Sequence, residues 1–206
     1  MRVVGSADEV IEDLKGGNKR FLSGRSIQSN DLSLQKLKNF AETGQIPKAI
    51  ILCCSDSRAP VEMIFDQDIG DLFVIRVAGN VVAPSLVGSV EFAVSAFGTP
   101  LVIVMGHSNC GAIKATLDHI IHTELIASEN IHDIVSRIKP HVFTITQIPS
   151  LSYEEKLEAC AQANVLASVN QLMHASRFIE DQVQKERLKI VGAMLDLASG
   201  EVAFLN

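Results

Sequence analysis

Three short apolar runs, each followed by polar residues, constrain the fold of this chain most. They are KAIILCC at 48–54, LFVIRVAGN at 72–80 and LVIVMGH at 101–107. Runs of this length, bounded by turn residues, predict strands that are buried on both faces. Between the last two, SLVGSVEFAVSAFG at 85–98 predicts a helix that ends at Gly98 before Pro100. Strands that alternate with helices indicate a parallel sheet with right-handed crossovers.

The two ends of the chain carry further signals. Ser6 begins a capping box, and the apolar residues that follow predict an amphipathic N-terminal helix, broken near Gly16-Gly17 or ended by Gly24. Residues 153–187 have a mostly helical pattern, and the last 19 residues predict two strands around Ser199-Gly200. Lys139-Pro140 interrupts the stretch between, whose shape the sequence leaves open.

Composition excludes several classes of protein. The chain has 206 residues, 47% hydrophobic and 20% charged, which fits one folded domain over 1–206. A net charge of -6 and a pI near 5.5 provide no basic surface, so nucleic acid is not an expected partner. No run approaches about 18 uninterrupted apolar residues, and no signal peptide is visible, so we expect no membrane partner and a cytoplasmic location.

The cysteines point to a metal or to free thiols. Four cysteines are too few for a disulfide scaffold in a chain of this length. If the strand at 48–54 continues, alternation places Cys54, Asp56 and Arg58 on one side and Cys53 on the other. A redox pair of Cys53 and Cys54 is disfavoured, because adjacent cysteines form strained disulfides.

His107 ends a second predicted strand, at 101–107, and Cys110 follows it three residues later. The carboxyl ends of two parallel strands would deliver Cys54, His107 and Cys110 to one edge of the sheet, where α/β proteins build their sites. Two thiolates and an imidazole suit zinc, and three protein ligands leave a fourth position for water. The helix that Cys110 and Gly111 open would favour the thiolate form of Cys110.

These motifs carry a resemblance to a known family. CSDSR at 54–58 and HSNCG at 107–111 resemble the two metal-site motifs of the β-class carbonic anhydrases, and GDLFVIRVAGN at 70–80 resembles a further segment of that family. The resemblance implies an α/β fold with a mainly parallel central sheet, an antiparallel C-terminal edge strand and flanking helices. It also implies a projecting N-terminal helix, here about residues 1–24, that embraces a partner subunit.

The same resemblance implies a function and a set of roles. Cys54, His107 and Cys110 would be ligands of Zn²⁺, and Asp56 with Arg58 would be a catalytic dyad. The reaction would be the reversible hydration of carbon dioxide to bicarbonate and a proton, by attack of a zinc-bound hydroxide that the dyad orients. The expected assembly is a homodimer or a tetramer.

Substrate-binding residues follow by position in the family. They would line a pocket between subunits: Gln45, Phe73, Ala78, Phe92 and Gly111. Some members of the family hold an inhibitory bicarbonate through a Trp, an Arg and a Tyr. This chain has Arg76 but Ile51 at the Trp position, and it contains no Trp, so we expect that site to be missing.

Two other functions remain open on the same fold. Relatives with this architecture hydrolyse carbonyl sulfide or carbon disulfide, and pocket width would decide between those gases and carbon dioxide. A non-catalytic protein that binds zinc and bicarbonate is the second alternative. The Asp56 and Arg58 pair disfavours it, because a structural zinc needs no oriented hydroxide and usually takes a fourth protein ligand.

Overall fold

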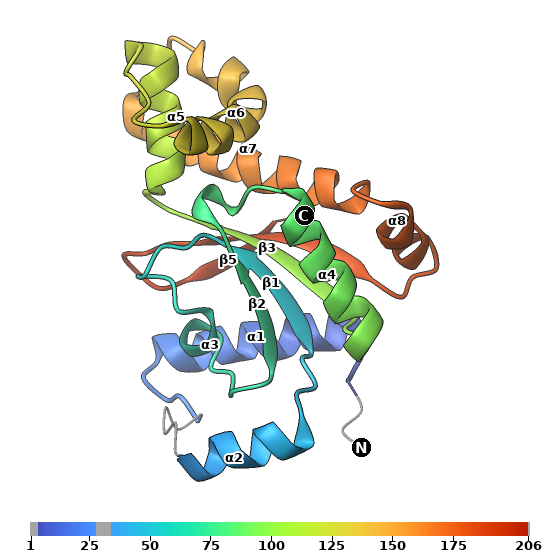
Figure 1. The fold of residues 1–206 in the computed structure, drawn as a ribbon. Coiled ribbons are helices and arrows are strands. Elements are labelled where there is room, and N and C mark those ends of the chain that lie inside the picture. The colour runs from blue at the N-terminus through green and yellow to red at the C-terminus, as the bar shows by residue number, and fades with distance from the viewer. Residues whose placement is uncertain (1–3, 28–33, 206) are drawn as a thin grey trace.

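A central five-stranded sheet organises the part of the chain that the computed structural model describes, residues 4–27 and 34–205 (Figure 1). The strands are β1 (Ala49–Cys53), β2 (Leu72–Arg76), β3 (Leu101–His107), β4 (Lys189–Leu195) and β5 (Val202–Leu205). Their order across the sheet is β2-β1-β3-β4-β5. The first four strands are parallel and β5 runs antiparallel to β4. The predicted α/β fold with an antiparallel edge strand is therefore confirmed.

Helices cover both faces of this sheet. They are α1 (Ala7–Leu22), α2 (Leu34–Thr43), α3 (Val61–Ile64), α4 (Pro84–Phe97), α5 (Gly111–His122), α6 (Glu129–Thr146), α7 (Tyr153–Met173) and α8 (Arg177–Gln184), with a 3₁₀ turn, η1 (Ala78–Asn80), after β2. Side chains of α4 to α8 are buried in one core against one face, and those of α1 and α3 in a second core against the other.

The alternation of β1 between these two cores is the feature that positions the site. Ile50, Leu52 and Cys54 belong to the core that α4 to α8 cover. Ile51 and Cys53 belong to the core that α1 covers. All five are buried, so the two adjacent cysteines point to opposite faces of the sheet, as predicted.

The N-terminal helix differs from the expectation. Val10, Ile11 and Leu14 of α1 are buried in the second core, so over residues 7–22 this helix lies on the sheet of its own chain and does not project. The physical reason is that the second face of the sheet is as apolar as the first and needs a cover. Residues 1–3 of the expected arm lie outside the described residues.

The two glycines do not break α1. A Cβ at residue 17 would lie 1.8 Å from the backbone oxygen of Phe65, so Gly17 is the position at which α1 passes directly over the chain that follows α3. A Cβ at Gly16 would meet only the end of the Arg20 side chain, at 3.5 Å. Gly17 is therefore a packing requirement and Gly16 is not.

Other differences are local. Pro140 lies inside α6 and does not interrupt it, and residues 120–150 form the end of α5, a short connection, α6 and the turn after it. The helical pattern over 153–187 is divided into α7 and α8, because Ser176 caps a new helix by accepting from the amide of Ile179. Sequence analysis did not predict α2, none of whose residues is buried.

Two substitutions test the contact between α1 and Phe65. Gly17→Ala should destabilise the protein by about 3 kcal/mol, because the methyl group cannot enter without moving backbone. Gly16→Ala should stabilise it by about 0.5–1 kcal/mol, because alanine is the better helix former and the space is open. Thermal unfolding at one protein concentration measures both. Equal effects of the two substitutions would contradict the packing assigned to α1.

Candidate metal centre

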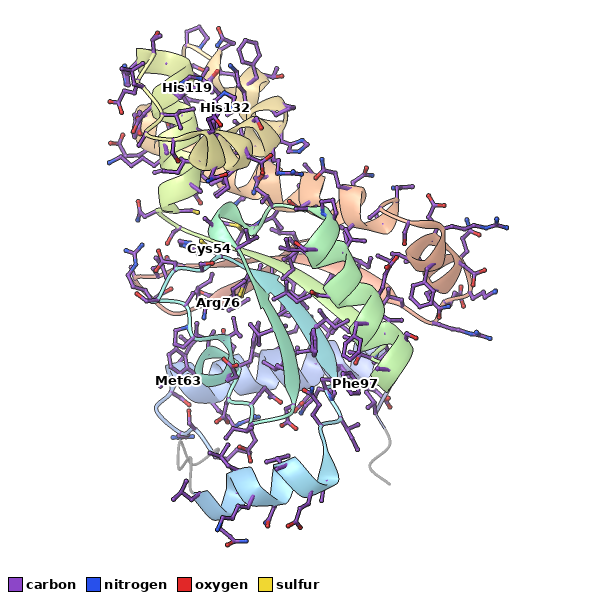
Figure 2. All side chains as sticks on the ribbon, in the orientation of Figure 1. Cys54, Met63, Arg76, Phe97, His119 and His132 are labelled. Atoms are coloured by element: carbon purple, nitrogen blue, oxygen red, sulfur yellow. The ribbon has the colours of Figure 1, made fainter. Side chains whose placement is uncertain are left out.

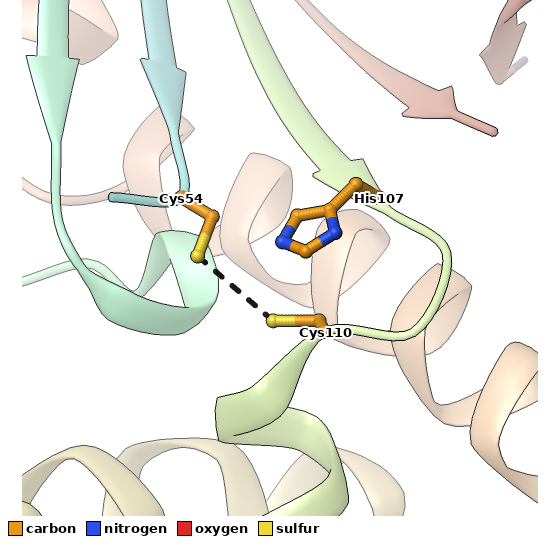
Figure 3. A group of neighbouring side chains, drawn as sticks. All are labelled: Cys54, His107 and Cys110. Carbon is orange, nitrogen blue, oxygen red and sulfur yellow. Dashed lines mark hydrogen bonds between the residues drawn. The ribbon is translucent and has the colours of Figure 1, made fainter. Parts of the chain in front are cut away.

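Three side chains converge where β1 and β3 end (Figure 3). Cys54 directly follows β1, His107 is the last residue of β3, and Cys110 is the N-cap of α5. Because β1 and β3 are parallel neighbours, these residues meet at one edge of the sheet. The Sγ atoms of Cys54 and Cys110 are 4.0 Å apart, and the three potential ligand atoms all lie within 4.8 Å of one another.

The turn between His107 and Cys110 is fixed by the end of β4. The amide of Ser108 donates to the carbonyl of Leu195 at 2.9 Å, and its hydroxyl accepts from the amide of Leu197 at 2.9 Å. Asn109 then adopts a left-handed conformation, with φ of 54°, which Asn tolerates better than most residues. This turn brings Cys110 back toward the strand ends.

The orientation of the His107 ring leaves one nitrogen available. Its Nδ1 lies 2.8 Å from the carbonyl oxygen of Ser108, which can only accept, so Nδ1 carries the proton. The Nε2 atom is buried and has no hydrogen-bond partner among the described residues. An unpartnered, buried lone pair beside two thiols is what a metal ligand provides.

The contact between the two thiols shifts the pKa of each. The hydrogen bond with Cys110 is the largest effect that lowers the pKa of Cys54, against the opposing effect of burial. The backbone amides of Gly79 and Asp56 contribute in the same direction. The same Cys54 contact, with burial, raises the pKa of Cys110. A second thiolate so close to the first needs a cation between them.

The Cys53 thiol differs from those of Cys54 and Cys110 in its location and in its pKa. Burial raises the pKa of its thiol to about 12, so Cys53 stays protonated in the second core. The expectation that Cys53 packs in the core while Cys54 faces the site agrees with this geometry.

Asp56 and Arg58 form a bidentate pair beside the cluster. Arg58 donates from Nε to Oδ1 at 2.9 Å and from Nη2 to Oδ2 at 2.7 Å, and its backbone amide also donates to Oδ1 at 2.9 Å. Hydrogen bonding by the Arg58 side chain holds the pKa of Asp56 well below its usual range. Asp56 Oδ2 lies 3.9 Å from His107 Nε2, so the carboxylate faces the metal cluster.

Arg76 holds the backbone of this loop, a role that sequence analysis missed. It is the last residue of β2 and donates from Nε to the carbonyl of Cys54 at 3.1 Å and from Nη2 to that of Asp56 at 2.5 Å. Figure 2 shows Arg76 close to Cys54. Since Ile51 is fully buried in the second core, the guanidinium has no aromatic partner at that position.

The predicted pocket residues fall into two groups. Ala78 lies in η1 and Gly111 begins α5, both next to the metal cluster. Gln45 is exposed before the start of β1, at the opposite end of the strand from Cys54. Phe73 and Phe92 contact each other, with ring centroids 6.2 Å apart, and both contact Phe97, which Figure 2 shows far from Cys54. One chain therefore brings only part of the expected pocket to the metal ligands.

The types and positions of these three side chains fit the binding of one metal ion. Two thiol sulfurs and one unpartnered imidazole nitrogen lie within reach of one ion, in a buried place.

In the described chain, no helix has the length and apolar character that crossing a membrane requires.

Comparisons with known proteins agree with this geometry. A family model described as carbonic anhydrase matches residues 49–202. Carbonic anhydrase 2 of Mycobacterium tuberculosis is 37% identical over 187 residues, covering 91% of this chain and 87% of its own. A carbonic anhydrase of Mycolicibacterium smegmatis is 35% identical over 189 residues, covering 92% and 88%.

Solved structures show the same fold. The β-carbonic anhydrase CcaA superposes with a TM-score of 0.74 at 25% identity, over 97% of this chain and 94% of that one. A tetrameric β-carbonic anhydrase of the filamentous ascomycete Sordaria macrospora gives 0.71 at 23% identity, over 96% and 98%. With its cysteine-histidine-cysteine cluster at the end of a mainly parallel sheet, the chain belongs to the β-class carbonic anhydrase family.

Proposed function

We propose that this protein is a zinc enzyme that catalyses the reversible hydration of carbon dioxide to bicarbonate and a proton. The observation that carries the proposal is the buried cluster of Cys54, His107 and Cys110 with the Asp56 carboxylate 3.9 Å from the free nitrogen of His107. Membership of the carbonic anhydrase family supports the reaction. Two thiolates and one imidazole support zinc as the metal.

Cys54, His107 and Cys110 would hold zinc in this proposal and leave one position open. Zinc supplies a Lewis acid that makes water a nucleophile near neutral pH. The amides of Ala112 and Ile113 lower the pKa of Cys110, against larger opposing effects from Cys54 and burial, and so help the second sulfur to ionise. Helix α5 thereby directs its N-terminal amides at a ligand.

Asp56 orients the attacking water in this proposal. Its carboxylate is an acceptor at the edge of the cluster, so it can accept one hydrogen of a water and direct a lone pair away from itself. Arg58 keeps Asp56 ionised and fixes its plane through two parallel hydrogen bonds. Arg76 sets the position of the loop by binding the carbonyls of Cys54 and Asp56.

The substrate pocket is proposed to form between two copies of the chain. Phe92 is 57% exposed on α4, and Gln45, Phe73 and Phe92 lie away from the metal ligands of their own chain. A second subunit could place these residues over the open position of the first. We therefore propose a homodimer as the minimal active unit, able to associate into a tetramer.

Substitution of the ligands tests the metal assignment. Cys54→Ser, His107→Ala and Cys110→Ser should each reduce bound zinc from about one ion per chain to a small fraction, because each removes one of three protein ligands. Cys53→Ser is the matched control, since it changes the adjacent thiol on the opposite face. Elemental analysis of the purified proteins measures the zinc bound per chain. Zinc loss in folded Cys53→Ser, with zinc retained in Cys54→Ser, would reverse the assignment.

Substitution of the dyad tests the chemistry. Asp56→Asn and Arg58→Ala should keep zinc but lower carbon dioxide hydration by about 10²-fold or more, because the water loses its oriented acceptor. Stopped-flow assays with a pH indicator measure the rate, and parallel assays with carbonyl sulfide measure the alternative reaction. Wild-type turnover of carbonyl sulfide but not of carbon dioxide would replace the proposed substrate, and unchanged rates in both variants would remove the dyad from the mechanism.

A pair of surface substitutions tests the dimer. Phe92→Glu should weaken association, because it places a charge in the proposed interface. Phe143→Glu on α6 alters a phenylalanine of similar exposure, 49%, on another helix and should leave the dimer intact. Sedimentation velocity measures both. A monomeric wild-type protein, or a Phe92→Glu dimer of unchanged affinity, would contradict the proposed interface.

A further inference from the structure

The η1 turn is packed from several sides at Gly79. Gly79 has a φ of 68°, in the left-handed region that favours glycine. A Cβ at this position would lie 2.8 Å from the Ile138 side chain of α6 and 3.0 Å from that of Ala112 on α5. The turn is therefore enclosed by the helices that cover the metal-site end of the sheet.

Asn164 contacts this turn from a third helix. It lies in the middle of α7, is 1% exposed, and has buried apolar neighbours at Ala161 and Val165. Its Nδ2 donates to the carbonyl oxygen of Gly79 at 2.8 Å, which joins residues 85 positions apart. Burying an amide in an apolar helix face is costly unless it is hydrogen-bonded, so this contact defines the place of the side chain.

Gly79 also lies against the helix that Cys110 caps. Ala112, which a Cβ at Gly79 would meet at 3.0 Å, is in the first turn of α5, two residues after Cys110. Glycine rotates more freely about its backbone bonds than any other residue, so a free Gly79 could shift the η1 turn away from this part of α5. A partner on the Gly79 carbonyl restricts that rotation.

We propose that Asn164 is a positioning residue for the metal centre, which holds Gly79 so that the η1 turn stays packed against the first turn of α5, the helix that Cys110 caps. Asn164 acts through this turn and is not itself one of the ligand residues. The inference rests on the proposed zinc site and adds a residue from outside both sequence motifs. It belongs to the outer contacts that orient metal ligands, whose loss typically lowers metal affinity about 10–100-fold.

The test compares zinc affinity in purified full-length variants. Asn164→Ala and Asn164→Leu should each weaken zinc binding about 10–100-fold, measured by competition with a chromogenic chelator. The leucine variant keeps roughly the size of the side chain and so separates the hydrogen bond from packing. In cobalt-loaded protein, both variants should alter the thiolate-to-cobalt absorption band, which a loss of stability elsewhere would not change.

Ser168→Ala is the control, because Ser168 is also 1% exposed on α7 and lies one turn further along the helix. It should leave zinc affinity and the cobalt spectrum unchanged. Wild-type zinc affinity in a folded Asn164 variant would overturn the proposal, and so would failure of both variants to fold, which would assign Asn164 a structural role only. A wild-type chain that binds no zinc would refute the proposed function itself, and this inference with it.

Discussion

The parallel pairing of β1 with β3 is the constraint on which the rest of the site depends. Its register opposes Cys53 to Met105, so both strands end within two residues of each other and deliver Cys54 and His107 to the same edge. Strand alternation then directs Cys54 toward the α4–α8 core and Cys53 into the other. A shift of one residue in β1 would turn Cys54 to the other face of the sheet and move its sulfur away from His107 and Cys110.

Charge imposes the second constraint. Two buried sulfurs 4.0 Å apart cannot both ionise without compensation. The chain supplies part of this compensating positive charge through backbone amides. The amides of Gly79 and Asp56 stabilise the Cys54 thiolate, and those in the first turn of α5 stabilise the Cys110 thiolate. The carboxylate of Asp56 adds another negative charge nearby, which Arg58 balances. What remains is a concentration of negative charge whose natural partner is a divalent cation.

Sequence analysis predicted the parts of this arrangement that local periodicity and motif spacing determine. The strand at 48–54, the turn after His107 and the opposite directions of Cys53 and Cys54 follow from patterns within a few residues. It could not predict where α1 packs, because an amphipathic helix fits its own sheet or a neighbour equally well. Pro140 was misinterpreted because its helix is stabilised by tertiary packing that local signals do not show. Asn164 gave one signal, a polar residue in an apolar helical pattern, but its partner lies 85 residues away.

The most direct test of the central claim is X-ray absorption at the zinc edge of the purified protein. If Cys54, His107 and Cys110 hold the metal with one position open to water, the spectrum should fit two sulfur ligands at about 2.3 Å and two nitrogen or oxygen ligands at about 2.0–2.1 Å. A shell of four sulfurs, or one with only nitrogen and oxygen, would contradict the account.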